Sequence, residues 1–221
     1  MDGLIARLAA LDTCAVSDAL DKLGLSGAVV GISPLTGPVK IAGRAVTIKL
    51  GAPLPGLPKR HLGAGAVMAS NPGDVIVVEH RGRTEVSGWG GLLSRGAVRR
   101  GVAAVLVDGA CRDIDESRML GLPVFARAAV PVTARGRVAE HSCEEPITFA
   151  TVAVKPGDLV IADGSGSGIV FVDAARAEEI VSTAEDIYAR EQRMAEAIDA
   201  GKAVGEVLSG DYEDMLKRRE T

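Results

Sequence analysis

Aromatic residues are scarce in this chain of 221 residues, which has one Trp, two Tyr and three Phe. A surface that stacks nucleic-acid bases needs aromatic side chains, so this composition argues against binding of single strands. An excess of positive charge is also absent, because the formal net charge is −4 and the pI is near 5.5. A nucleic-acid partner is therefore not expected.

Cysteine and histidine are few and scattered, with three residues of each type. The chain has no CxxC, HxH or HxxxH spacing, and an odd number of cysteines is not a disulfide framework. A zinc site with nitrogen and sulfur ligands is therefore not expected. The residues concerned are Cys14, Cys111, Cys143, His61, His80 and His141.

Long apolar runs are missing as well, since none approaches the ~18 residues of a membrane span. The first twenty residues also lack the apolar core of a signal peptide. We therefore expect a cytoplasmic protein in a reducing compartment. Apolar residues make up 47% of the chain and charged residues 24%, which is typical of a globular protein. The length suits one substantial core, so residues 1–221 are expected to form a single domain.

Periodic patterns predict a mixed α/β fold with a helical hairpin at the front and a long helix at the end. Gly3–Leu11 and Val16–Leu23 are the two front helices, the second with Thr13 as N-cap and Gly24 as its end. A long amphipathic helix is predicted from Ala174 to about Ala200. The predicted strands are 41–50, 75–78, 103–107, 123–126, 149–154, 159–162 and 169–172.

The centre of the chain, Gly88–Arg127, carries the clearest functional signal. Leu92–Arg100 has the pattern of a helix that Gly101 ends, with Leu92, Leu93, Ala97 and Val98 on one side. Ala103–Val107 is wholly apolar, as in a strand buried on both faces. Asp108–Gly109 is predicted to turn, and Arg112–Asp113 follows at the carboxyl end of the strand, where open α/β sheets bind ligands.

Arg112 and Asp113 are the first candidates for chemistry. A guanidinium binds a substrate carboxylate through two parallel hydrogen bonds, and a carboxylate at such a place can hold Mg²⁺. The alternative is that the two residues only cap the next helix, together with Asp115 and Glu116. The residues by themselves slightly favour this alternative.

Gly90, Gly91, Leu92 and Leu93 are the second candidates. Glycines at a helix start leave backbone N–H groups free and allow a ligand to approach, and the helix dipole favours an anion. A tight turn that needs positive φ explains the glycines equally well. One helix and one strand connect this segment to Arg112, so both candidates could meet at one sheet edge.

A third glycine-rich segment, Asp163–Gly168, superficially resembles a nucleotide or methyl-donor loop. Such a loop must lead into a helix, whereas Ile169–Val172 has the pattern of a strand. We interpret the segment as a hairpin turn.

Seven motifs occur in the order and spacing of a known family. They are TCAVSDALDKLG (13–24), GISPL (31–35), PGDV (72–75), WGGLL (89–93), DGACRD (108–113), GLPVFAR (121–127) and VKPGDLVIAD (154–163). The chain thereby resembles the family of 4-hydroxy-4-methyl-2-oxoglutarate aldolases and the regulator of ribonuclease activity A. The resemblance covers residues 12 to about 173.

The resemblance implies a single α/β domain of the swivelling type, assembled as a homotrimer or hexamer with the active site between subunits. It implies Mg²⁺ or Mn²⁺ held by Asp113, pyruvyl oxygens contacted by Arg112, and a carboxylate bound by the amides of Leu92 and Leu93. An acidic residue from the C-terminal helix of a neighbouring subunit would complete the metal site through water. Glu191 is our choice for that residue, with Glu196 as the alternative.

One departure from the family pattern concerns Gly91, because the characterised aldolases carry an acidic residue after the WG motif. The surroundings of the metal would then be less charged. The Ser-Gly repeat from Gly164 to Gly168 also replaces an Asp-rich segment.

The resemblance implies a metal-dependent lyase that acts on 2-oxo acids through a pyruvate enolate. Its reactions would be retro-aldol cleavage, decarboxylation of oxaloacetate, or both. The alternative is a non-catalytic regulator that binds a ribonuclease or another protein. A methyltransferase, a label once given to some members, would require binding of S-adenosylmethionine.

Overall fold

The computed structural model describes residues 3–56, 61–164 and 168–208. Within these ranges the chain forms a nine-stranded mixed sheet and a separate two-stranded hairpin. The strand order of the large sheet is β1-β11-β10-β3-β4-β5-β6-β2. The ninth strand, β7, pairs with β3 and is not part of this order. The predicted mixed α/β fold is confirmed. No helix in these ranges is long and apolar enough to cross a membrane.

Four parallel strands form the middle of the sheet: β3 (Ile41–Gly51), β4 (Val75–Trp89), β5 (Ala104–Cys111) and β6 (Val124–Ala129). The short helices α3 (Ala64–Ala69), α4 (Gly91–Arg100) and α5 (Ile114–Met119) connect them. The two faces of the strands are covered differently. One packs against α3 and α4, and the other against the hairpin of β8 (Ile147–Phe149) and β9 (Val152–Val154).

The remaining strands pair antiparallel at the flanks of the large sheet. β10 (Leu159–Ala162) pairs with β3 and with β11 (Ile169–Val172), and β1 (Ala28–Val29) pairs with β11. At the other end β2 (Ser33–Pro34) pairs with β6, while β7 (Ala139–Cys143) joins the end of β3. The predicted hairpin between β10 and β11 is confirmed, although Ser165–Ser167 of its turn lie outside the described residues.

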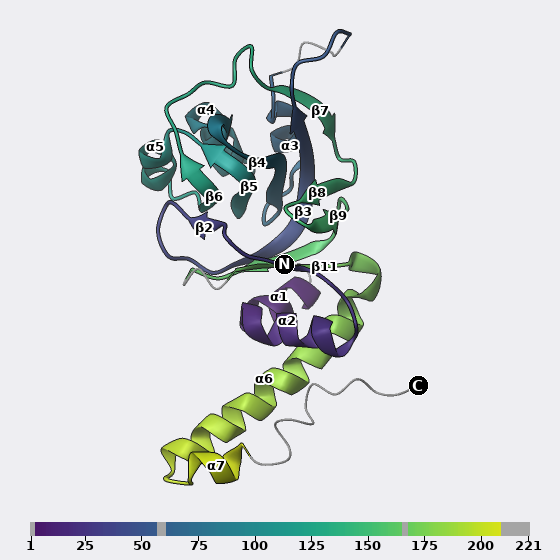
Figure 1. Ribbon diagram of the computed structural model, residues 1–221, viewed down its shortest axis with the longest axis vertical. Coiled ribbons are helices and arrows are strands. Elements are labelled where there is room, and N and C mark those ends of the chain that lie inside the picture. Colours follow the sequence, from purple (N-terminus) through teal and green to yellow (C-terminus); the bar gives the residue numbers. More distant parts are fainter. Residues whose placement is uncertain (1–2, 57–60, 165–167, 209–221) are drawn as a thin grey trace.

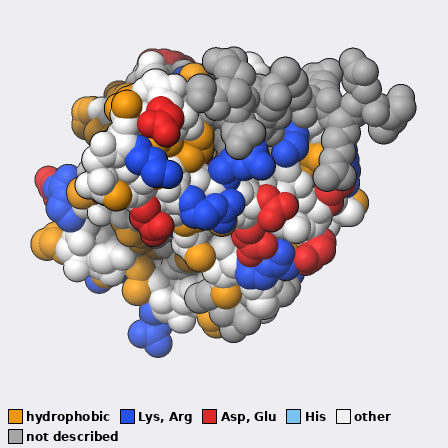
Figure 2. Space-filling model, turned by 90° about the horizontal axis from the view of Figure 1, so that it is seen from below, with side chains coloured by type: hydrophobic (Ala, Val, Ile, Leu, Met, Phe, Trp, Pro, Cys, Tyr) orange, Lys and Arg blue, Asp and Glu red, His pale blue; other side chains and the backbone are white. Residues whose placement is uncertain are grey.

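The front helices α1 (Gly3–Ala10) and α2 (Thr13–Lys22) pack beneath the sheet against α6 (Ala177–Asp199), which follows the short η1 (Ala174–Arg176) (Figure 1). Leu8, Val16 and Ile180 are fully buried there. Beyond Ile187 the helix α6 leaves the body, and α7 (Val204–Val207) follows at its far end. Seen from that end, basic and acidic side chains lie next to one another (Figure 2).

An ion-pair cluster fixes α1 to α6. Arg7 donates to Glu178 Oε1 at 2.6 Å and to both carboxylate oxygens of Glu185 at 2.7 and 2.8 Å. The hydrogen bond from Arg7 holds the pKa of the Glu185 carboxyl below its usual value, despite partial burial. The front hairpin is thereby tied to the N-terminal half of the long helix.

Two predicted boundaries and one predicted helix face were wrong, because the apolar pattern does not show caps, turns or the position of the sheet. The N-cap of α2 is Asp12, whose side chain accepts from Ala15 N at 2.7 Å, while Thr13 lies inside the helix and donates to Asp163. The predicted strand 149–154 is split at Ala150, which has φ +54°, into β8 and β9. Leu92 of α4 is 77% exposed, so its side chain is not on the buried side of the helix.

The two central strands are longer than their apolar runs. β4 continues past Val78 because its polar second half still pairs with β5, from Arg83 to Trp89. The predicted turn at Asp108–Gly109 was also wrong, since both residues lie within β5. Asp108 is buried there because Arg127 and the Ala150 amide compensate its charge.

Candidate functional site

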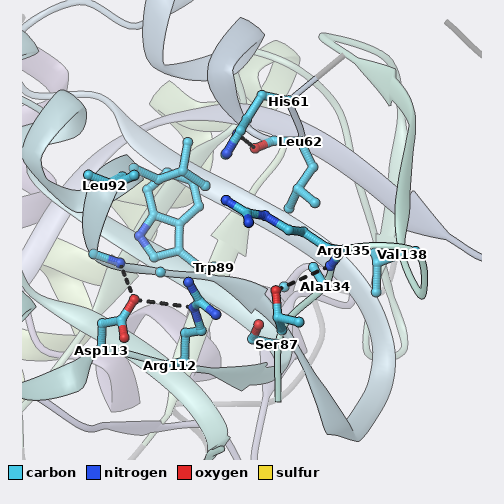
Figure 3. Close-up of a pocket in the computed structure, with 16 residues that line it drawn as sticks. His61, Leu62, Ser87, Trp89, Leu92, Arg112, Asp113, Ala134, Arg135 and Val138 are labelled. Carbon is cyan, nitrogen blue, oxygen red and sulfur yellow. Dashed lines mark hydrogen bonds and ion pairs between the residues drawn. The ribbon is translucent and has the colours of Figure 1, made fainter. Parts of the chain in front are cut away.

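A pocket of about 320 Å³ opens at the carboxyl ends of β4 and β5, on the face of the sheet that carries α4. We call it the first pocket (Figure 3). Its size is at the lower end of the range for small-ligand sites. The residues that line it come from the segment before α3, the end of β4, the start of α4, the loop after β5 and the segment before β7. They are His61, Leu62, Ser87–Leu93, Arg112, Asp113, Thr133–Gly136 and Val138.

Arg112 and Asp113 lie side by side at the rim of the first pocket, each with 39% of its side chain exposed. Arg112 Nε is 3.2 Å from Asp113 Oδ2, and the Arg112 amide donates to the Trp89 carbonyl at 3.0 Å. Asp113 has φ +58°, a left-handed conformation that Asp tolerates better than most residues. The expected position of both residues, directly after β5, is confirmed.

The start of α4 faces the Asp113 carboxylate. Gly91 N donates to Asp113 Oδ2 at 2.9 Å, while the amides of Leu92 and Leu93 are in the first turn and have no acceptor within the helix. Gly90 allows this close approach, since a Cβ there would lie 3.1 Å from Asp113 Oδ2 and 3.2 Å from Arg112 Cγ. The two groups of candidates therefore meet at one edge of the sheet, as predicted. Asp113 does not cap α5 with its side chain.

A buried hydrogen-bonded chain holds the elements of the site together. Trp89 Nε1 donates to Ser94 Oγ at 3.0 Å, and Ser94 Oγ is 2.8 Å from Ser117 Oγ. All three residues are at most 2% exposed. This chain links the end of β4 to α4 and α5, so Arg112 and the helix start keep a fixed relation to one another.

Several lining residues carried no signal in the sequence. Arg135 and His61 both extend over the pocket in Figure 3, and both are exposed. The segment that carries Arg135 is placed by the Ser87 amide, which donates to the Val132 carbonyl at 3.1 Å. With Arg112 they provide guanidinium and imidazole groups to the lining of the pocket. Only the fold reveals this, because these residues lie in loops far from the motif in sequence.

The space beside Gly91 is already filled by Glu116 from α5. A Cβ at Gly91 would overlap the Glu116 carboxylate, which is also 2.6 Å from Arg95 Nε. An acidic group therefore does stand next to the start of α4, although position 91 has no side chain. It is supplied from the residue three positions after Asp113.

Glu191 and Glu196 lie on α6, away from the first pocket of their own chain (Figure 1). Partial burial raises the pKa of the Glu191 carboxyl, and the nearby Asp18 and Asp12 add to this effect. The prediction assigned one of the two residues to the site of a neighbouring subunit. It remains a prediction, because the structure describes one chain.

Cys111 directly precedes Arg112 but takes no part in the pocket. Its side chain is fully buried in β5, and burial raises the pKa of the thiol far above its usual value. A thiol that stays protonated is a poor nucleophile. Covalent chemistry at Cys111 is therefore not supported.

The donor set of the first pocket fits a hydrated divalent ion. Asp113 Oδ1 forms no hydrogen bond within the described residues, and no cluster of three or more acidic, His or Cys side chains that could hold a metal occurs there. Mg²⁺ commonly binds one or two protein carboxylates and keeps waters and ligand oxygens for its other positions. One available carboxylate oxygen beside a pocket meets that requirement.

Comparison with known proteins assigns the chain to a family. The RraA-like model, described as Aldolase/RraA, matches residues 13–170. Protein DlpA of Legionella pneumophila is 30% identical over 218 residues, which are 96% of this chain and 34% of DlpA. This chain thus spans about a third of that relative.

Two further proteins match this chain along nearly all of their own length. The "Putative 4-hydroxy-4-methyl-2-oxoglutarate aldolase" of Halalkalibacterium halodurans is 29% identical over 90% of this chain and 92% of its own. RraAS2 of Streptomyces coelicolor, described as an unusual member of the RNase ES inhibitor RraA protein family, has a TM-score of 0.80. It is 26% identical and covers 89% of this chain and 98% of its own. The protein belongs to the Aldolase/RraA family.

Proposed function

We propose that the protein is a divalent-metal-dependent lyase that cleaves 2-oxo acids through a pyruvate enolate. The observation that carries the proposal is the placement of the Arg112 guanidinium and the Asp113 carboxylate opposite the first amides of α4. Substrates would be compounds like 4-hydroxy-4-methyl-2-oxoglutarate, oxaloacetate, or both. The name of the relative from Halalkalibacterium halodurans supports the first of these reactions.

Substrate binding would use the helix start and the basic groups around it. The amides of Leu92 and Leu93 provide two donors for the 1-carboxylate of the substrate, and the helix dipole favours the negative charge. Arg112 lines the same pocket, and its terminal nitrogens would bind the 2-oxo oxygen. Arg135, at the opposite side of the pocket, suits the second carboxylate of a dicarboxylic substrate.

Asp113 would hold Mg²⁺ or Mn²⁺, and an acidic residue of a neighbouring subunit, Glu191 or Glu196, would complete the site through water in a homotrimer or hexamer. The ion, when bound, supplies a Lewis acid for the charge that develops on the 2-oxo oxygen. Arg112 adds a fixed positive charge to the same oxygen. One such electrostatic partner typically contributes a rate factor of about a hundred or more.

Both reactions break the bond between C3 and C4 of the substrate. In decarboxylation the bonding electrons pass into the C2–C3 bond and the C4 carboxylate leaves as CO₂. In retro-aldol cleavage the C4 hydroxyl gives up its proton and C4 becomes a carbonyl. Each route produces the enolate of pyruvate, which takes up a proton at C3. Arg112 stabilises the enolate oxygen in both cases.

The test is turnover of oxaloacetate and of 4-hydroxy-4-methyl-2-oxoglutarate by the purified protein with Mg²⁺ or Mn²⁺. We expect activity that EDTA removes and that falls about hundredfold or more in Arg112→Ala. Arg118→Ala, on the exposed side of α5, is the matched control and should keep full activity. Activity that resists EDTA, or wild-type turnover by Arg112→Ala, contradicts the proposal.

The second candidate is a regulator that binds a ribonuclease, which the likeness to RraAS2 favours. Its binding surface would not need Arg112 or Asp113. Inhibition of a ribonuclease by both the wild-type protein and Arg112→Ala, without turnover of either oxo acid, would support this candidate over the lyase.

A further inference from the structure

A second pocket lies at the same sheet edge as the first but on the opposite face, beside the β8–β9 hairpin. This open cavity of about 620 Å³ is lined by Lys49, Glu79, Arg81, Gly82, Asp108, Arg127, Thr148, Ala150 and Thr151. The proposed lyase chemistry uses none of these residues. Five of the nine carry a charge, three positive and two negative.

The charged side chains come from four adjacent strands at one level of the sheet. Lys49 of β3 pairs in register with Glu79 of β4. Val78, Val107 and Ala126 are in register across β4, β5 and β6, and the next residues along these strands are Glu79, Asp108 and Arg127. Across the carboxyl ends of the parallel strands, these four residues form a row of charges with a cation at each end and two anions between them.

The two carboxylates of the row are buried and fully occupied. Glu79 accepts from Arg81 Nε at 3.0 Å and from Thr148 N at 2.9 Å. Asp108 accepts from Arg127 Nε at 2.6 Å and from Ala150 N at 3.1 Å. Their side chains are only 4% and 5% exposed. A ligand that enters the cavity would thus not meet an available carboxylate.

The cations, in contrast, are accessible. The side chains of Lys49, Arg81 and Arg127 are 35%, 57% and 28% exposed. Each arginine contacts its carboxylate through Nε, and its terminal nitrogens have no partner among the described residues. Lys49 Nζ is 3.8 Å from Glu79 Oε2, which is a loose contact. Two guanidinium groups and one ammonium group therefore present hydrogen-bond donors to the cavity.

We propose that the second pocket binds a small oxyanion, with a phosphate or carboxylate group as the ligand. Three cations against two neutralised carboxylates leave one excess positive charge, and guanidinium groups bind both kinds of anion through paired hydrogen bonds. Glu79 and Asp108 serve to orient Arg81 and Arg127. The proposal is independent of the lyase function, because the two pockets open on opposite faces of the sheet.

Isothermal titration calorimetry of the full chain tests the site, with inorganic phosphate in one arm and succinate in the other. We expect saturable binding of at least one anion, weakened about tenfold by Arg81→Gln and by Lys49→Gln. Binding of phosphate alone or of succinate alone identifies the preferred group. Arg127 is left unchanged in this test because its loss would leave Asp108 buried without its ion pair.

Two control variants separate this site from general charge effects and from the first pocket. Arg83→Gln removes a cation of β4 that pairs with Glu85 outside the cavity and should keep wild-type affinity. Arg112→Gln alters the first pocket, and in this background Arg81→Gln should still weaken the remaining binding about tenfold. The proposal is overturned if neither anion binds, if Arg83→Gln weakens binding as much as Arg81→Gln, or if Arg81→Gln has no effect in the Arg112→Gln background. Circular dichroism melting shows that each variant is folded.

Discussion

The two pockets at the carboxyl edge of the parallel strands use the same residue types in opposite ways. In the second pocket, Asp108 is 5% exposed and both its oxygens are occupied by protein donors. In the first pocket, Asp113 is 39% exposed and only one of its oxygens accepts hydrogen bonds from the protein. Asp108 therefore supports the fold, whereas Asp113 is available for an ion or a substrate.

This difference follows from the position of each residue along β5. Asp108 lies inside the strand, where the β8–β9 hairpin covers it and removal from water has to be compensated by a cation and an amide. Asp113 lies two residues beyond the strand, where water can solvate its free oxygen. Mutations should consequently separate stability from activity along one short segment.

The largest expected effect is on stability, from Asp108→Ala. The substitution leaves the Ala150 amide without its acceptor and the Arg127 guanidinium, which is 28% exposed, without its ion pair, so we expect a loss of about 2 kcal/mol in the free energy of unfolding. Urea denaturation measures it. A loss as small as that of an exposed substitution would show that the row of charges does not stabilise the fold.

A smaller effect is expected at Gly91, where a side chain has to displace Glu116. Gly91→Ala should reduce the free energy of unfolding by about 1 kcal/mol. In a Glu116→Ala background the same change should be neutral or stabilising, because Ala favours helix more than Gly does. A double-mutant cycle by urea denaturation gives the coupling. Additive effects of the two substitutions contradict the overlap.

The pH dependence of stability should show the contribution of His80, a buried residue of β4 whose ring packs against Gly88. Burial lowers the pKa of its imidazole below the ordinary value of 6.5, and its Nε2 is 2.9 Å from the Val86 carbonyl. The unfolded chain thus takes up a proton below pH 6.5 while the folded chain does not. Stability from this group is complete above that pH and is lost as the pH falls towards the folded pKa.

We therefore expect the melting temperature to fall less between about pH 7.5 and about pH 5.5 in His80→Gln than in the wild type. His61→Gln, which changes an exposed histidine, is the control and should keep the wild-type dependence. Equal slopes for the wild type and His80→Gln would rule out this contribution.

The smallest expected effect on stability comes from Asp113→Asn. Asn also tolerates the left-handed backbone of this position, and its side-chain oxygen can still accept from Gly91 N. The free energy of unfolding should change by no more than about 0.5 kcal/mol. Metal-dependent turnover should nevertheless disappear, because a neutral amide is a weak ligand for Mg²⁺. A stability loss as large as that of Asp108→Ala would contradict the inference that Asp113, unlike Asp108, is not needed for the fold.

The sequence predicted the elements with strong periodicity and left out those held by long-range pairing. The helix Leu92–Arg100 was correct because Gly101, at φ +76°, ends it locally. The second half of β4 was missed because its alternation is polar, and only pairing with β5 makes it a strand. The side of α4 that is buried could not be known before the sheet was placed, so Leu92 was assigned wrongly.

The sequence by itself determined the mixed α/β class, the meeting of Arg112 and Asp113 with the glycine-led helix, and the motifs of the Aldolase/RraA family. These features depend on short segments of chain, whose periodicity and turn residues act locally. The tertiary structure alone decided that Glu116 fills the space at Gly91, that Arg135 and His61 reach the first pocket, and that four strands align a row of charges. Such contacts join residues distant in the chain, and only the register of the sheet brings them together.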